Sequence, residues 1–184
     1  MNPQRAFEIC RNLPGMLWES EAVALHGLFG SSRVHAEVGV YAGKSLWITA
    51  YAMGKEGKLF AIDNCIANFV TPAWSRRALL SALILIENQI GCKVTHVDNW
   101  SIDAARLLFQ DGVVLDSVYI DARHDYDSIL SDIEAWTPLV KSGGIIAGHD
   151  YFAQFPGVID AVNETGPFTV IPNTRIWYLS LIHI

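Results

Sequence analysis

The chain has 184 residues, of which 51% are hydrophobic and 17% are charged. This length predicts a single domain over residues 1–184, and the apolar content excludes general disorder because it can fill a two-sided core. The 13 Lys and Arg residues against 19 Asp and Glu residues give a formal net charge of −6, which opposes attraction to nucleic-acid phosphates.

The cysteines and the apolar runs indicate the compartment. Cys10, Cys65 and Cys92 are widely spaced and form no CxxC or Cys/His pattern, so neither a disulfide framework nor a zinc site is predicted. Charged residues interrupt the first eleven positions, where a signal peptide needs an unbroken apolar stretch. The longest apolar run, residues 78–86, is far shorter than the roughly 20 residues that cross a bilayer. We therefore expect a cytoplasmic protein with no membrane partner.

The predicted elements alternate along the chain. Residues 1–32 form an N-terminal helical segment, in which Ser20 caps a helix that ends at Gly30. Later helices are expected at 44–53, at 72–90 with Thr71 as N-cap and Gly91 as stop, at 102–109 with Ser101 as cap, and at 127–140. Strands are expected at 34–40, 58–63, 93–97, 116–121 and from 143 to 148.

The alternation predicts an α/β fold, a doubly wound and mostly parallel sheet covered by helices on both faces. Residues 167–182 are β-branched and aromatic and are broken by Pro172-Asn173, so they predict a C-terminal antiparallel hairpin at one edge. The helix at 72–90 is apolar on most of its circumference, which is typical of a helix that is deeply buried or shared with another subunit. A homo-oligomer through this helix is a hypothesis.

The first strand ends in the turn EVGVYAGKS, which precedes a helix. A phosphate loop needs four residues between its first glycine and GK[ST], but only three separate Gly39 from Gly43. A dinucleotide fingerprint needs a glycine where Tyr41 stands, so that backbone can approach a pyrophosphate. What remains is a cofactor with a ribose and an adenine but no phosphate. Asp63, at the end of the second strand, can accept the ribose hydroxyls, and Glu37 can meet a ligand amino group.

The segments AEVGVYAGKS, FAIDN, VYIDARHDYDSILSDIEAWTPLVKSGGIIAGHDY and TRIWYLSL, in this order, resemble the class I S-adenosylmethionine-dependent methyltransferases. The similarity is to a small bacterial branch with ExGxxxGxS and IDxxHxY motifs, and it covers most of the chain from Arg33 onward. It implies a Rossmann-like methyltransferase fold of about seven strands. It also implies S-adenosylmethionine as cofactor and a small-molecule methyl acceptor.

The resemblance also implies a set of site residues. The turn after the first strand would surround the methionine part of the cofactor, Asp63 would hold the ribose, and Trp100 with Ser101 would flank the adenine. The full set of cofactor-binding positions is Glu37, Gly39, Val40, Tyr41, Gly43, Ser45, Asp63, Trp100, Ser101 and Asp121.

Related metal-dependent O-methyltransferases imply a divalent cation on Asp121, His149 and Asp150. Those enzymes have Asp followed by Asp or Asn where this chain has His149 and then Asp150. Histidine is a poorer magnesium ligand than a carboxylate, so either another metal binds or none does.

An oxygen nucleophile needs its proton removed during methyl transfer, by a base or by a metal that acidifies the hydroxyl. His124 and His149 both follow strand ends on the ligand side, so they are the candidate bases, with Asp121 as the third catalytic candidate. The expected reaction is O-methylation of a small hydroxylated metabolite or sugar. Two alternatives stay open: a protein that binds the nucleoside cofactor without turnover, and a small nucleotide enzyme related to phosphate-loop proteins.

Overall fold

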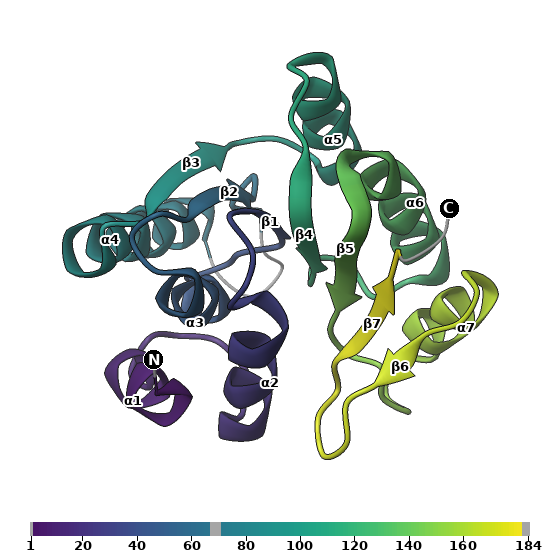
Figure 1. Ribbon diagram of the computed structural model, residues 1–184, viewed down its shortest axis with the longest axis horizontal. Coiled ribbons are helices and arrows are strands. Elements are labelled where there is room, and N and C mark those ends of the chain that lie inside the picture. The colour runs from purple at the N-terminus through teal and green to yellow at the C-terminus, as the bar shows by residue number, and fades with distance from the viewer. Residues whose placement is uncertain (1, 67–70, 182–184) are drawn as a thin grey trace.

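A seven-stranded sheet forms the centre of the computed structural model, which describes residues 2–66 and 71–181. The strand order is β3-β2-β1-β4-β5-β7-β6 (Figure 1). The first five strands are parallel, whereas β7 is antiparallel to both β5 and β6. The strands are β1 Val34–Val38, β2 Lys58–Ile62, β3 Lys93–Val97, β4 Leu115–Ile120, β5 Val140–Gly148, β6 Thr169–Val170 and β7 Trp177–Ser180.

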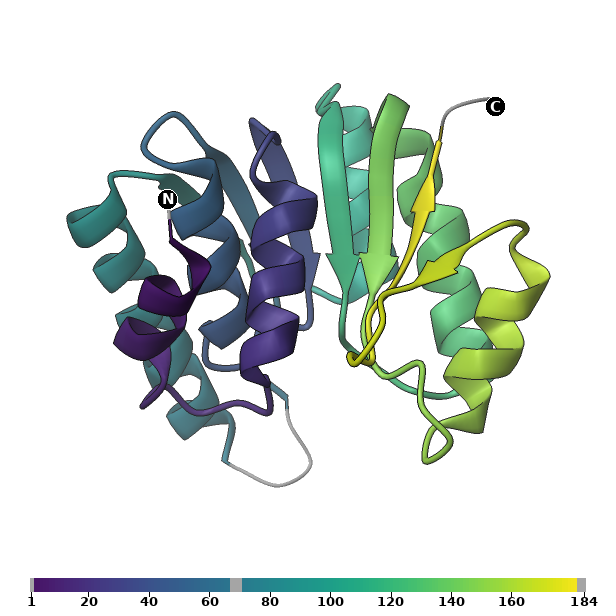
Figure 2. The ribbon, with the colours of Figure 1, turned by 60° about the horizontal axis from the view of Figure 1, so that its bottom comes forward.

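Helices cover both faces of the sheet (Figure 2). Helices α1–α4 share one apolar cluster, and α5–α7 share the other. The two clusters lie on opposite faces of the sheet, because successive side chains of a strand point to opposite faces. In β1, Ala36 and Val38 face the second cluster, whereas Glu37, between them, faces away from it. The helices are α1 Pro3–Cys10, α2 Glu19–Phe29, α3 Lys44–Met53, α4 Pro72–Ile90, α5 Ser101–Gln110, α6 Tyr126–Trp136 and α7 Pro156–Glu164. The predicted doubly wound α/β fold and its C-terminal hairpin are confirmed, although residue 182 of the hairpin prediction lies outside the described residues.

Several predicted boundaries are confirmed by their caps. The Thr71 hydroxyl accepts a hydrogen bond from the Trp74 N–H, and Pro72 follows as the first residue of α4. Gly91 ends α4 in the left-handed conformation at φ +79°. None of the helices in the described part of the chain has the length and apolarity that crossing a membrane requires.

Three predicted helix starts or ends were wrong. Trp18, not Ser20, is the N-cap of α2, because the Glu21 carboxylate accepts a hydrogen bond from the Trp18 N–H and starts the helix earlier. Ser101 is the first residue of α5 rather than its cap. The helix predicted at 127–140 ends at Trp136, and a 3-10 turn, Thr137–Leu139, leads into β5. Pro138 explains that end, because proline cannot continue the α-helical hydrogen-bond ladder.

Two further differences concern β5 and α7. Strand β5 starts at Val140, before the predicted glycine pair, and its pairing with β4 shifts register between Leu115 and Ser117. Helix α7 was not predicted, although Pro156 at its first turn and the buried residues Val158, Ala161 and Val162 mark a helix with one apolar face.

The sheet order fixes where a ligand can bind. Strand β1 lies between β2 and β4. The helix that follows β2 covers one face of the sheet, and the helix that follows β4 covers the other face. In open parallel sheets, the crevice at this reversal point lies beyond the carboxyl ends of the strands. The segments that follow β1, β2, β4 and β5 therefore meet at one edge.

Candidate functional site

The turn after β1 passes close to the backbone that follows β4. Gly39 has φ +85°, and a Cβ built there would lie 2.1 Å from the Asp121 carbonyl oxygen, so only glycine fits. Gly43 has φ +79°, and its Cβ would lie 2.7 Å from the Ala82 Cβ on α4. Tyr41 also lies in the left-handed region, at φ +52°. The two glycines thus let the turn bend and approach neighbouring segments of the protein.

Glu37 is fully buried at the end of β1, beneath the start of α3. Its Oε1 accepts a hydrogen bond from the Ser45 hydroxyl at 2.6 Å. Its Oε2 is buried and has no hydrogen-bond partner in the part of the chain that the structure describes. Burial, with a smaller contribution from the charges of Asp121 and Asp63, raises the pKa of Glu37 to about 8. Among the described residues, no cationic side chain forms an ion pair with this carboxyl group.

Asp63 joins the turn after β1 to the chain after β2. Its Oδ2 accepts a hydrogen bond from the Tyr41 N–H, and its Oδ1 accepts one from the Cys65 N–H, each at 2.6 Å. His96 of β3 contacts the Asp63 carbonyl oxygen at 2.8 Å. Each carboxylate oxygen has a second lone pair, so the group is held in place and can still accept hydrogen bonds from a ligand.

The two residues predicted to flank an adenine have different surroundings. Trp100 is 56% exposed after β3. The Ser101 hydroxyl donates to Asp132 of α6 at 2.5 Å and accepts a hydrogen bond from the Trp136 indole at 2.9 Å. Its side chain thus takes part in the packing of α5 against α6, whereas the Trp100 side chain is largely exposed.

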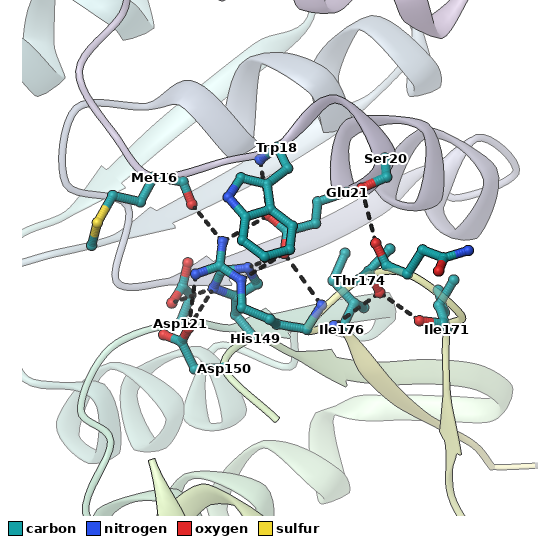
Figure 3. A network of polar contacts seen from close by, with 12 residues as sticks. Met16, Trp18, Ser20, Glu21, Asp121, His149, Asp150, Ile171, Thr174 and Ile176 are labelled. Carbon is teal, nitrogen blue, oxygen red and sulfur yellow. Dashed lines mark hydrogen bonds and ion pairs between the residues drawn. The ribbon is translucent and has the colours of Figure 1, made fainter. Parts of the chain in front are cut away.

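His149 lies in a buried ionic network at the end of β5 (Figure 3). Its Nε2 is 3.1 Å from Glu21 Oε1, and its Nδ1 is 3.3 Å from Asp150 Oδ1 and 3.7 Å from Asp121 Oδ1. Burial alone would lower the pKa of His149, but Asp121, Asp150 and Glu21 outweigh it and raise the pKa to about 10. The three carboxylates therefore favour the protonated form of His149.

Arg175, in the turn between β6 and β7, is the second cation of this network. Its Nε and Nη2 donate to the two carboxylate oxygens of Glu21 at 2.8 and 2.9 Å, a bidentate pair. Its Nη1 is 3.5 Å from Asp150 Oδ1, and its guanidinium stacks 4.3 Å from the ring centre of Trp18. Burial would raise the pKa of Glu21, but hydrogen bonds from His149 and Arg175 lower it to about 2. The network ties α2 to the C-terminal hairpin.

His124 lies at the outer side of the same cluster. Its Nε2 is 2.9 Å from Asp150 Oδ2, and its side chain is 38% exposed whereas that of Asp150 is 9% exposed. The hydrogen bond with Asp150 raises the pKa of His124 above its usual value. Burial, together with the charge of Asp150, raises the pKa of Asp121. The structure thus places the accessible imidazole of His124, which the buried carboxylate of Asp150 orients, beside the reversal point of the sheet.

Comparisons with known proteins agree with this arrangement. A family model described as a methyltransferase domain matches residues 36–151, well over half of the chain. The chain belongs to this methyltransferase family. No curated protein sequence matches it at a significant level.

Solved structures of similar fold include known methyltransferases. The cofactor-bound Rv0187 from MTB has a TM-score of 0.72 and 16% identity, over 100% of this chain and 92% of that one. The O-methyltransferase from Bacillus cereus in complex with SAH has a TM-score of 0.68 and 14% identity, over 96% and 89%. The O-methyltransferase TomG from Streptomyces achromogenes in complex with SAM has a TM-score of 0.66 and 17% identity, over 97% and 87%. The prediction of a class I S-adenosylmethionine-dependent methyltransferase is confirmed in family and fold.

In this methyltransferase the residues at the reversal point of the sheet fit S-adenosylmethionine. The orphaned Oε2 of Glu37 offers a buried acceptor for a cationic ligand group. Asp63 and Trp100 supply a fixed carboxylate and an exposed indole on neighbouring strands. The precise role of each predicted cofactor-binding residue stays a prediction.

The residues that could hold a divalent cation differ in part from the predicted set. Within the described residues, the groups that offer three ligand atoms within 4.8 Å of one another are Asp121, His124 and Asp150, a set that contains His124 and not the predicted His149. The Nε2 of His149 lies 3.1 Å from Glu21 Oε1, and its Nδ1 lies 3.3 Å from Asp150 Oδ1.

Sequence analysis missed Glu21 and Arg175, which lie 154 positions apart in the chain. Glu21 sits in the N-terminal helical segment and Arg175 inside the predicted hairpin, in the segment TRIWYLSL, and neither was predicted to be a site residue. One signal was present, since Glu21 is a charged residue among apolar positions of α2, where burial requires a partner.

Proposed function

We propose that this methyltransferase transfers the methyl group of S-adenosylmethionine to a hydroxyl oxygen of a small metabolite or sugar, with His124 as the general base. The observation that carries the proposal is the His124–Asp150 pair, an accessible imidazole bonded to a buried carboxylate at the carboxyl edge of the sheet. An imidazole in this position can take the proton that a hydroxyl loses as it becomes a nucleophile.

The residues of the first turn would hold the cofactor. Glu37 Oε2 would accept a hydrogen bond from the amino group of its methionine part, and Asp63 would accept hydrogen bonds from the ribose hydroxyls. Trp100 would stack on the adenine. When bound, the cofactor supplies a methyl group on a sulfonium sulfur, and the sulfur keeps the electron pair of the broken C–S bond.

The chain's own part in the reaction is positioning and proton transfer. In-line displacement needs the acceptor oxygen aligned with the methyl carbon, and alignment of this kind supplies much of the rate enhancement. The Nε2–H of His124 donates to Asp150, so Nδ1 is the nitrogen that takes the acceptor's proton. Asp150 holds the ring in this tautomer and stabilises the imidazolium that forms.

The nucleotide alternative finds no support in Lys44. Its Nζ donates to the carbonyl oxygens of Arg11 and Gly15, each at 3.3 Å, so it anchors the N-terminal segment. A phosphate-loop lysine would instead point at a phosphate group.

Ligand binding and turnover separate the remaining possibilities. We expect S-adenosylhomocysteine to raise Tm, and NAD and magnesium-ATP to leave it unchanged. With a panel of hydroxylated acceptors and S-adenosylmethionine, release of S-adenosylhomocysteine should depend on the acceptor. The variant His124→Gln should lose at least about 100-fold in kcat, the usual size of a general-base contribution, with S-adenosylhomocysteine affinity within a few-fold. The variant His26→Gln, which changes a histidine in the last turn of α2, is the matched control.

Two results would count against the proposal. Stabilisation by magnesium-ATP alone would favour a nucleotide enzyme. Binding of S-adenosylhomocysteine with turnover unaffected by His124→Gln would show that another group accepts the proton.

A further inference from the structure

Helix α4 carries apolar side chains on its outward face as well as on its inward face. Figure 1 shows α4 at the periphery of the molecule, near the edge strand β3, so deep burial does not explain its apolar surface. On the outward face Leu80 and Ile84, about one turn apart, are 42% and 60% exposed. A helix that is apolar on both faces is typical of one that packs against a partner on each side. The residues of α4 that are buried within the protein are Ser75, Leu79, Ala82, Leu83 and Ile86.

Opposite charges flank the exposed apolar pair. Arg77 lies about one turn before Leu80, and Glu87 lies about one turn after Ile84. Both charged side chains are exposed, and the ion pairs among the described residues include neither of them. We call these four residues the α4 face. It is positive towards its start, apolar in its middle and negative towards its end.

The spacing of the α4 face is symmetric about Ala82. Leu80 and Ile84 each lie two positions from Ala82. Arg77 and Glu87 each lie five positions from it. When two copies pair their α4 helices antiparallel about a two-fold axis at the level of Ala82, Leu80 lies opposite Ile84 of the second copy. The same axis places Arg77 opposite Glu87, so the contact is self-complementary. Parallel pairing would instead place each charge against its like, and like charges repel.

The neighbouring edge of the sheet is protected against a different kind of association. Strand β3 ends the strand order and pairs with β2. The Lys93 N–H donates to the Gly57 carbonyl oxygen on the β2 side, so the N–H of the next residue, Val94, points to the open side. Glu87 Oε1 accepts a hydrogen bond from this N–H at 3.2 Å. A carboxylate over an edge strand opposes the addition of another strand, which favours the helix as the contact surface at this end of the molecule.

We propose that the α4 face is the interface of a homodimer, in which α4 of one copy packs antiparallel against α4 of a second copy. A second copy fits because the face complements itself in charge and in apolar position. An anionic membrane surface fits poorly, since the chain has a formal net charge of −6. Helix α4 has 19 residues and is about 28 Å long, so a single pair of such helices gives a small interface. We therefore expect a dimer of micromolar affinity.

Sedimentation equilibrium of the full chain tests the proposal. We expect the average mass to rise from one chain towards two between about 1 and about 200 µM, the range that suits a small interface. Ile84→Glu should weaken the dimer at least about tenfold, because it places a charge in the middle of the contact. Phe109→Glu, which changes an equally exposed side chain on α5, is the matched control and should leave the dimer unchanged. A monomer throughout, or a dimer that Ile84→Glu does not weaken, would overturn the proposal.

Two charge variants test the antiparallel arrangement. Arg77→Glu and Glu87→Arg each place like charges opposite each other in a homodimer, so each variant alone should dimerise more weakly than the unmodified chain. In a mixture of the two variants both contacts join opposite charges, so a heterodimer should form, measured by sedimentation with one variant fluorescently labelled. Both side chains are exposed, so these variants serve if Ile84→Glu fails to fold. A mixture that associates no better than its components would overturn the antiparallel arrangement and the proposal with it.

Discussion

Glu37→Gln should make the ligand-free protein more stable, and the gain should increase with pH. Burial raises the pKa of Glu37 from the ordinary 4.5 to about 8. The folded protein therefore holds this proton up to a higher pH than the unfolded chain does. As pH rises from 4.5 towards 8, Glu37 ionises in the unfolded chain but stays protonated in the folded protein. This ionisation stabilises the unfolded chain alone, so the free energy of unfolding falls. Glutamine has nearly the same shape and cannot ionise, so it removes this loss.

The size of the effect follows from the two pKa values of Glu37. Each unit of difference is worth about 1.36 kcal/mol once the pH lies between them. The variant should therefore exceed the unmodified protein in free energy of unfolding by about 1 kcal/mol at pH 5, about 3 kcal/mol at pH 7 and about 5 kcal/mol at pH 9. The Ser45 hydroxyl can still donate, to the glutamine carbonyl oxygen, so little is lost at that contact.

Urea unfolding at the three pH values measures this difference. Glu56→Gln, at an exposed turn, is the matched control and should change the free energy of unfolding by less than about 0.5 kcal/mol throughout. The same Glu37 variant should bind S-adenosylmethionine at least about tenfold more weakly, because it loses the acceptor for the ligand amino group. A stability difference that stays constant from pH 5 to pH 9 would refute the assignment of a buried, proton-holding carboxyl at this position.

Three other predictions concern the rest of the site. Glu21→Gln should lower the free energy of unfolding at pH 7 by about 3 kcal/mol, since it breaks a buried pair with His149 and Arg175; a loss below about 1 kcal/mol in urea unfolding would contradict the network. The rate of methyl transfer should rise with pH through a pKa above 6.5, because His124 must be unprotonated to act and Asp150 raises its pKa; a profile that is flat from pH 6 to pH 9 would exclude it as the base. Asp63→Asn should weaken S-adenosylhomocysteine binding about tenfold by calorimetry, and unchanged affinity would place the ribose elsewhere.

Local patterns in the sequence were sufficient for most of the fold. The helix at 44–53 and the strand at 93–97 were predicted to the residue, since glycine or a change of periodicity marks both ends. Prediction was weaker where tertiary contacts override propensity. Strand β5 begins at Val140 because pairing with Leu115 of β4 recruits this residue, which periodicity had assigned to the preceding helix.

The sequence by itself determined the segments that end at the ligand-binding edge, because turn glycines, caps and strand-terminal acids act over a few neighbouring residues. Only the tertiary structure decided what those residues contact. It gave Gly39 its close neighbour in the Asp121 backbone, and it surrounded His149 with carboxylates from three segments of the chain. The protonation and ligand capacity of a histidine depend on the charges within a few ångströms, whatever their separation in sequence, and Glu21 lies 128 positions before His149.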